Sequence, residues 1–406
     1  MPLSICLDYK FAAILLFLLL PQSSNCKMGS RTSDEQSTGT TGTASDGERP
    51  TMSDRERAGL RGPVEQCTEE TITPSGSNYP AMRYGSTTKY DPTGRILHIS
   101  YTHADGSKSM GSHIYDTQGH LLKAIWGRPS GPASETNYTY DEKGRLIGMT
   151  GDGEPRQSST FQYDDQGRKT RIVKSELKPS SSGTDDRIAV SFDAENDDLF
   201  MPAPVGGLVK TLFNERDQPT ESQIYEANGH LTSRLVRRYD AKGRVSESDY
   251  VIEDIKFILP AEAREQLMAE PGASEELKKQ LIQLLGAQRE FSRNSYIYDA
   301  EGRVTEKHFR VGAHQEMITK ITYNDNGDKM QEHTTTVGDL NPTKSAEGSE
   351  IAPTARASVS PQESEVRYGY QYDSFGNWIE QTISSRPSPS EPFTTSTVHH
   401  RTITYY

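Results

Sequence analysis

The hydrophobic and polar positions from about residue 83 onward alternate with a period of two, in short runs separated by polar, glycine-containing segments. Such alternation is typical of half-buried β-strands. Between the runs a unit recurs: an aromatic residue, Asp, two variable residues, Gly, often Arg, then an aliphatic residue. Tyr90, Tyr115 and Tyr140 begin successive copies that are 25 residues apart. The pattern therefore predicts a repeated β-hairpin.

Nine clear copies share the aromatic, acidic or amide, and glycine positions. They are YDPTGRI at Tyr90, YDTQGHL at Tyr115, YDEKGRL at Tyr140, YDDQGRK at Tyr163, YEANGHL at Tyr225, YDAKGRV at Tyr239, YDAEGRV at Tyr298, YNDNGDK at Tyr323 and YDSFGNW at Tyr372. We expect their turns to be built by Tyr90, Asp91, Gly94, Tyr115, Asp116, Gly119, Tyr140, Asp141, Gly144, Tyr163, Asp164, Gly167, Tyr225, Gly229, Tyr239, Asp240, Gly243, Tyr298, Asp299, Gly302, Tyr323, Gly327, Tyr372, Asp373 and Gly376. Two decayed copies are FDAENDD at Phe192 and FNERDQP at Phe213.

The copy at Tyr140 illustrates the expected mechanics. A type I turn after Tyr140 places Gly144 in the left-handed conformation, and the Asp141 side chain accepts hydrogen bonds from the turn. Tyr140 then lies opposite Leu146 on one face of the hairpin, worth about 0.2–1 kcal/mol per pair. Asp141 and Arg145 are expected to face the other way as a solvated ion pair of little net value.

Composition agrees with a thin sheet rather than with one large core. Only 32% of the residues are hydrophobic, whereas Tyr (20) and Gly (33) are abundant. The formal net charge of −12 argues against a nucleic-acid partner, since that needs a basic face. A lone hairpin is marginal in water, so successive hairpins must stack edge to edge. We expect a mainly β protein whose antiparallel hairpins form a long curved or spiral sheet, with a small two-helix insertion.

These patterns divide the chain into seven segments. They are a signal peptide (1–26), a disordered spacer (27–82), repeat hairpins (83–250, degenerate over 179–212), a helical insertion (251–291), further hairpins (292–336), a disordered loop (337–365), and a C-terminal hairpin with a final strand (366–406). The insertion is expected to form helices over 260–270 and 274–285. It either covers a face of the sheet or docks a partner.

The N-terminal segment predicts export. Residues 11–20 (FAAILLFLLL) are too short to span a bilayer and are followed by a polar tail that ends at Cys26. Cys26 is either the lipid attachment site of a lipoprotein or the last residue of a cleaved signal. Cys6, Cys26 and Cys67 are the only cysteines, so neither a disulfide framework nor a cysteine zinc site is expected. The protein is predicted to be secreted or envelope-anchored, reaching a membrane only through a lipid on Cys26.

The repeated unit resembles the YD repeat of the Rhs family, from about Arg83 to Tyr406 with the two interruptions excepted. The resemblance implies a continuous sheet of β-hairpins, which coils into a hollow shell in large members. Bacterial toxins of the family store a toxic domain behind a self-cleaving core, and animal teneurins use a similar shell in adhesion. Here only 30 residues follow Gly376. We therefore expect neither the toxin domain nor the self-cleaving core, and too few copies for a closed shell.

Candidate chemistry is sparse, and no catalytic residue, cofactor or metal ligand is predicted. No P-loop, Gly-x-Ser-x-Gly or His-Glu-x-x-His motif occurs. Asn324–Asp328 resembles part of a calcium loop but also fits the repeat's turn. Trp378 occupies an aliphatic slot opposite Tyr372 and is expected to pack in the core. Trp126 lies outside the motif slots and is the better candidate for a ligand platform.

These features lead to three functional hypotheses. The first is an exported, non-enzymatic protein of the bacterial envelope or surface that binds a protein or polysaccharide through its repeat sheet. The second is an accessory shell or chaperone that encloses a separate toxin or cargo chain. The third, a glycan-acting hydrolase, ranks last because no nucleophile and base can be named from their spacing.

Overall fold

The computed structural model describes residues 52–75, 80–129, 131–152, 157–175, 203–204, 206–253, 290–311, 315–338 and 362–406. The predicted signal peptide with Cys26, the decayed copy at Phe192, residues 254–289 of the predicted helical insertion and residues 339–361 of the predicted loop lie outside these ranges. Among the described residues, no helix is long and apolar enough to cross a membrane.

A short helix, α2 (Asp54–Arg57), precedes twenty strands in the described part of the chain. The strands are β1 (Val64–Thr73), β2 (Met82–Tyr90), β3 (Ile96–Thr102), β4 (Lys108–Tyr115), β5 (Leu121–Gly127), β6 (Ala133–Tyr140), β7 (Leu146–Gly151), β8 (Gln157–Tyr163), β9 (Lys169–Ser175), β10 (Leu208–Phe213), β11 (Pro219–Tyr225), β12 (Leu231–Tyr239), β13 (Val245–Ile252), β14 (Glu290–Tyr298), β15 (Val304–Val311), β16 (Gln315–Tyr323), β17 (Lys329–Val337), β18 (Gln362–Tyr372), β19 (Trp378–Arg386) and β20 (Thr394–Tyr405).

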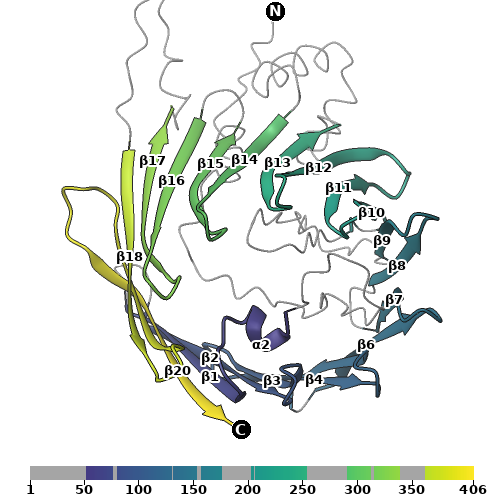
Figure 1. Ribbon diagram of the computed structural model, residues 1–406, viewed down its shortest axis with the longest axis horizontal. Helices are drawn as coiled ribbons and strands as arrows, with labels where there is room; N and C mark the ends of the chain where they lie inside the picture. Colours follow the sequence, from purple (N-terminus) through teal and green to yellow (C-terminus); the bar gives the residue numbers. More distant parts are fainter. Residues whose placement is uncertain are drawn as a thin grey trace, which may run out of the picture.

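The strands form one closed antiparallel barrel (Figure 1). Each strand pairs with its neighbours in chain order, and β1 pairs with β20, where Cys67 lies opposite Ile403 and Thr71 opposite His399. The prediction of a mainly β protein is confirmed, but the prediction of an open curved or spiral sheet is wrong. The physical reason is that β1 offers its edge to β20, so the backbone groups at both ends of the sheet are paired.

The strand that closes the barrel comes from the segment predicted as a spacer. Residues 27–82 were expected to be disordered, yet residues 52–75 contain α2 and β1, so that prediction is wrong there. Ser53 begins α2 with a capping box to Glu56. Strand β1 has few apolar residues, but its Thr residues favour strands, and its polar side chains other than Thr71 are only half-buried. The predicted disordered loop (337–365) is also too long at both ends, because Val337 lies in β17 and residues 362–365 lie in β18. The same holds for the predicted helical insertion (251–291), since residues 251–252 lie in β13 and residues 290–291 lie in β14.

Nine motif turns gather at one end of the barrel, which we call the turn rim. They connect β2–β3, β4–β5, β6–β7, β8–β9, β10–β11, β12–β13, β14–β15, β16–β17 and β18–β19. The decayed copy at Phe213 belongs to this set, and Asp217 takes the glycine position with a φ of 57°. The clear copy at Tyr225 instead joins β11 to β12 at the opposite end. The sequence pattern groups this copy with the other clear copies, but the strand that leads into its turn runs in the opposite direction to the strands that lead into theirs.

The face that carries the tyrosines of the turn rim lines the inside of the barrel, whereas Tyr225 lies on the opposite face from Ile224. Helix α2 lies within the ring of strands (Figure 1), and Leu60, which follows it, packs against Val64 and Tyr90 on this face. Eight strands already enclose a space that side chains fill, so a ring of twenty strands encloses a wider lumen. The opposite, outer face carries ion pairs, such as Arg234 with Glu253 at 2.5 Å.

Apolar packing on the inner face is concentrated where the motif has decayed. A buried cluster joins β9 to β13 and includes Val209, Ile224 and Leu235, which are 1%, 0% and 1% exposed. Cys67 belongs to a second buried cluster near the closure of the barrel. Burial raises the pKa of its thiol to about 11, so this cysteine is inert at neutral pH.

Two turn glycines provide a matched test of how α2 is held. Gly94 and Gly167 have φ values of 90° and 80°, so alanine at either position should cost about 1–2 kcal/mol in backbone strain. A Cβ on Gly94 would lie 2.7 Å from Ser53 Oγ, whereas one on Gly167 meets nothing within 4 Å. We expect Gly94→Ala to lower the free energy of unfolding by about 1 kcal/mol more than Gly167→Ala, because the cap of α2 is displaced. Urea denaturation measures both, and equal losses would contradict this account.

Candidate binding groove on the inner wall

The turns of the turn rim share one hydrogen-bonding pattern. In the copy at Tyr140, Asp141 Oδ1 accepts from the backbone N–H groups of Lys143 and Arg145 at 2.9 Å, and Asp141 Oδ2 accepts from Arg145 Nε at 2.8 Å. The turn glycine of every clear copy has a positive φ: Gly94, Gly119, Gly144, Gly167, Gly229, Gly243, Gly302, Gly327 and Gly376. Asp thus organises the turn while Gly adopts a conformation that other residues resist.

The tyrosines tie each hairpin to the one before it. Tyr140 lies opposite Leu146, and its hydroxyl donates to the carbonyl of Leu121 at 2.9 Å. The same bond joins Tyr115 to Ile96, Tyr163 to Leu146, Tyr239 to Pro219, Tyr298 to Val245 and Tyr323 to Val304. In the last hairpin the bond to Lys329 comes from Tyr370, not from Tyr372. Tyr225, at the other end, bonds Gln223.

The motif arginines lie over the tyrosines of the following repeat. The Arg145 guanidinium is 4.2 Å from the ring centroid of Tyr163, and Arg244 is 4.4 Å from that of Tyr298. The expectation that Asp141 and Arg145 form a merely solvated ion pair on the other face is therefore wrong. The bulge after the turn lets the arginine fold back across the inner wall, where its stacking adds about 0.5–1 kcal/mol.

The turn carboxylates should make the barrel sensitive to acid. Hydrogen bonds from Arg244 lower the pKa of Asp240, and a side-chain hydrogen bond from Arg168 lowers that of Asp164. A carboxyl group whose folded pKa lies below its unfolded value of about 3.9 stabilises the fold above that pH and loses this contribution as the pH falls through the folded pKa. We expect the free energy of unfolding in urea to fall below about pH 4, and less steeply in Asp240→Asn. Unchanged stability down to pH 2.5 would contradict this.

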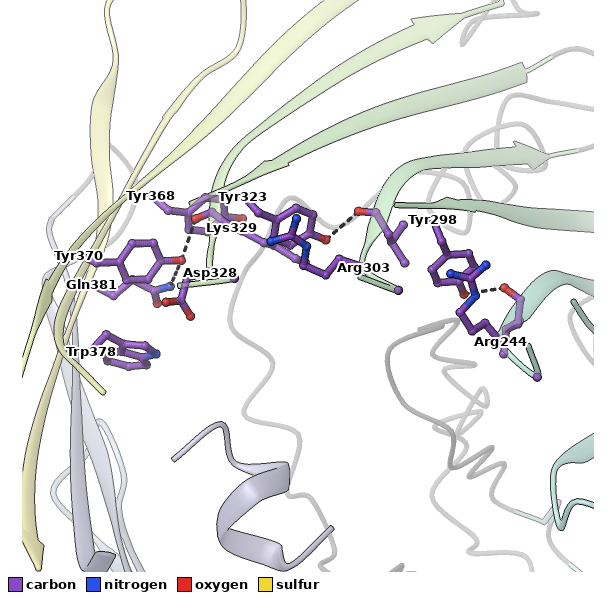
Figure 2. Close-up of a pocket in the computed structure, with 15 residues that line it drawn as sticks. Arg244, Tyr298, Arg303, Tyr323, Asp328, Lys329, Tyr368, Tyr370, Trp378 and Gln381 are labelled. Carbon is purple, nitrogen blue, oxygen red and sulfur yellow. Dashed lines mark hydrogen bonds between the residues drawn. The ribbon is translucent and has the colours of Figure 1, made fainter. Parts of the chain in front are cut away.

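A groove of about 550 Å³ runs along the inner wall at the turn rim, across four successive hairpins from β12–β13 to β18–β19 (Figure 2). Its lining combines aromatic rings, cations and one carboxylate. The residues are Gly243, Arg244, Val245, Tyr298, Gly302, Arg303, Val304, Tyr323, Gly327, Asp328, Lys329, Tyr368, Tyr370, Trp378 and Gln381. Because these hairpins are neighbours in a curved wall, the groove is lined by equivalent motif positions of successive repeats.

Asp328 is the carboxylate of this lining and stands where most copies have arginine. The Tyr323 copy has Asn324 in place of the motif's aspartate, and its turn closes normally, with Asp328 N–H donating to Asn324 Oδ1 at 2.9 Å. The hydroxyl of Tyr372 donates to Asp328 Oδ2 at 2.8 Å. Within the described ranges no group of three or more His, Cys, Asp or Glu side chains could hold a metal ion. Asn324–Asp328 is thus a repeat turn whose charges differ from the motif.

The two tryptophans occupy different places on the inner wall. Trp378 lies opposite Tyr372 as expected, but it lines the groove, and the Arg401 guanidinium lies 3.4 Å from its ring centroid. Trp126 is outside the groove, on β5, and stacks at 6.1 Å on Tyr101. A Cβ on Gly111 would lie 2.7 Å from the Trp126 ring, so one face of this indole is packed into the wall.

The phenols of the groove are hydrogen-bond donors at neutral pH. Burial raises the pKa of Tyr370 to about 12, and burial also raises that of Tyr368. Burial and the hydrogen bond to Asp328 raise the pKa of Tyr372. Protonated phenols and a carboxylate favour polar recognition over proton abstraction by tyrosine.

Residues 53–63, which we call the strap, contact the barrel wall beside the groove through Asn377. Asn377, 1% exposed, stands in the motif's arginine slot. Its Oδ1 accepts from Arg61 N–H at 2.6 Å, and its Nδ2 donates to the Arg61 carbonyl at 2.9 Å and to the Tyr405 hydroxyl at 2.8 Å. The small amide leaves room for the strap, which an arginine would fill.

Sequence reasoning considered Asp328 only as part of the turn that resembles a calcium loop, and it did not single out Asn377, Tyr370 or Arg61. A signal was available for Asp328 and Asn377, because the last two copies, NDNGDK and DSFGNW, are those that replace the motif arginine with Asp and Asn. Tyr370 and Arg61 gave no such signal, since their partners are distant in sequence.

Comparison with known proteins agrees with the repeat geometry. Residues 71–188 match the family model of the teneurin YD-shell. This segment belongs to the YD/Rhs-repeat family. A comparison with curated proteins gives no match. A search of solved structures gives a porin-like protein from Bacteroides uniformis, with 8% identity and a TM-score of 0.34, over 85% of this chain and 98% of that chain.

The family match covers the YD repeats of strands β2 to β9 and confirms the resemblance over that range. The later YD repeats lie beyond residue 188. They have the same tyrosine hydrogen bonds and arginine stacking as the earlier repeats, as Tyr298 and Tyr323 show.

Proposed function

We propose that this protein is an exported, non-enzymatic YD shell that holds an extended segment of a separate polypeptide in its lumen. The observation that carries the proposal is the position of the groove, which lies on the inner wall of a closed barrel. A ligand bound there is surrounded by the wall. This favours the accessory-shell hypothesis over binding through an outer sheet surface. Export rests on the apolar run at residues 11–20.

A polypeptide suits the groove better than a polysaccharide does. Sugars bind aromatic platforms through exposed ring faces, but here guanidinium groups already cover rings of the lining. Arg244 lies over Tyr298, Arg303 lies 4.7 Å from the centroid of Tyr323, and Arg401 covers Trp378. The remaining polar groups, including the side chains of Gln381 and Asp328, match the donors and acceptors of a peptide.

A non-enzymatic role is supported by the chemistry of the lining. The groove contains one carboxylate, whereas a glycosidase needs two that face each other across the substrate. Its lining includes no Ser, Cys or His that could pair as nucleophile and base.

The test combines native mass spectrometry with site-specific cross-linking in cells that naturally produce the protein. We expect a mass excess that is lost on denaturation. A photoreactive residue in place of Gln381, on the inner wall, should label a second polypeptide. The same residue in place of Gln371, which is exposed on the outer face of the same hairpin, should not.

Three results would contradict the proposal. Labelling from Gln371 alone would place the ligand on the outer face. A labelled glycan would replace the polypeptide with a polysaccharide. A bare chain without cross-links from either position would mean that the lumen holds no separate chain.

A further inference from the structure

We infer that Asp328, Tyr370 and Trp378 form a subsite for an organic cation, the ammonium or guanidinium group of a lysine or arginine side chain. This inference rests on the proposed function, because it names the residue type that the enclosed polypeptide would place there. Figure 2 shows the Asp328 carboxylate between the side chains of Tyr370 and Trp378 in the groove. All three side chains are half-buried, so they remain accessible from the lumen.

The carboxylate is held in place but its charge is not neutralised by a neighbour. Tyr372 donates one hydrogen bond to Asp328 Oδ2 at 2.8 Å and thereby orients the group. Among the described residues, Asp328 forms no ion pair with Arg, Lys or His. The motif aspartates Asp240 and Asp299, by contrast, pair with Arg244 and Arg303 at 2.6 and 2.7 Å.

Most of the nearby cations are matched by another carboxylate, whereas Arg61 donates to the backbone carbonyls of Asn326 and Gly376 at 2.6 and 3.1 Å. Lys329 Nζ lies 3.4 Å from Glu332, Arg303 pairs with Asp299, and Arg401 Nε lies 2.9 Å from Glu69. Among the described residues none of these cations forms an ion pair with Asp328, so its carboxylate can accept a cationic group from a ligand. One face of each ring is already occupied, by Tyr372 over Tyr370 and by Arg401 over Trp378. The remaining faces attract ammonium and guanidinium groups.

Trp378 already accepts a guanidinium within the molecule. The 3.4 Å contact with Arg401 shows that this indole is compatible with a stacked cation whose charge is balanced by a carboxylate. The inferred subsite would combine the same two elements, an aromatic ring and an acidic partner, with the cation supplied by the ligand.

The test is a titration of the full chain with two fluorescently labelled pentapeptides, acetyl-Gly-Gly-Lys-Gly-Gly-amide and the same peptide with norleucine instead of lysine. Fluorescence anisotropy should show tighter binding of the lysine peptide. Asp328→Asn should weaken its binding about tenfold or more, since a charge-assisted contact is lost. Asp325→Asn makes the same charge change at an exposed position of the same turn and should leave binding unchanged.

A second variant guards against misfolding. Asn324→Asp combined with Asp328→Arg rebuilds the motif's own ion pair, so it should fold like the other turns and lose the preference for lysine. Equal binding of the two peptides would overturn the inference, as would equal losses in Asp328→Asn and Asp325→Asn. Cross-linking from Gln381 decides the container role separately, so either idea can fail while the other stands.

Discussion

Replacing Asn377 with alanine is expected to lower the free energy of unfolding by about 3 kcal/mol, because it removes the hydrogen bonds of a buried amide and leaves backbone groups of the strap unpaired. Asn377 bonds both the N–H and the carbonyl of Arg61 and also contacts Tyr405. It thus joins the strap to the last strand, where the barrel closes. Guanidinium denaturation followed by fluorescence measures the loss.

Asn137→Ala is the matched control, since Asn137 is exposed on β6, and it should change stability by less than about 0.5 kcal/mol. Hydrogen exchange should also locate the effect of Asn377→Ala. Amides of β1 and β20 should exchange faster, because opening begins where the two ends of the sheet meet. Loss of protection spread evenly around the barrel would contradict the idea that this asparagine clasps the closure.

Replacing Ile224 with alanine is expected to lower the free energy of unfolding by about 3–4 kcal/mol, since it removes a fully buried side chain and leaves a cavity. Ile224 is 0% exposed and belongs to the apolar cluster that includes Val209 and Leu235. This cluster lies where the decayed copy at Phe213 has lost the motif glycine and the tyrosine hydroxyl. Apolar packing there replaces the bonding of the other repeats.

Ile297→Ala is the control for that prediction, because Ile297 is 52% exposed on the outer face and should contribute less than about 0.5 kcal/mol. Thermal and urea unfolding should rank the two variants in the same order. Similar losses for both would show that the inner cluster does not carry the stability of this arc of the barrel.

The sequence predicted hairpins well because their signals are local. Tyr140, Asp141 and Gly144 lie within five residues, and each acts on the turn it belongs to. The copy at Tyr225 was misread for the same reason. Its local pattern makes a good turn, but only the alternation of strand direction along the barrel decides that this turn lies at the other end.

The candidate groove was less accessible to sequence reasoning. Trp378 was assigned correctly to its slot opposite Tyr372. Its accessibility to the lumen, however, depends on the curvature of the wall, and its contact with Arg401 depends on β20 lying beside β19. Asp328 shows the intermediate case, since its departure from the motif is visible in the sequence but its lack of a cationic partner is not.

The sequence by itself determined the repeated hairpin, the conformation of its turns and the mainly β character of the protein, because alternation, Asp side chains and glycine act over a few residues. Only the tertiary structure decided that the sheet closes. Closure depends on β1 meeting β20 across more than three hundred residues and on Arg61 meeting Asn377 across 316. No local pattern encodes such a meeting, since strand edges are satisfied by any partner that arrives in register. The same closure turned the tyrosine face into the wall of a lumen.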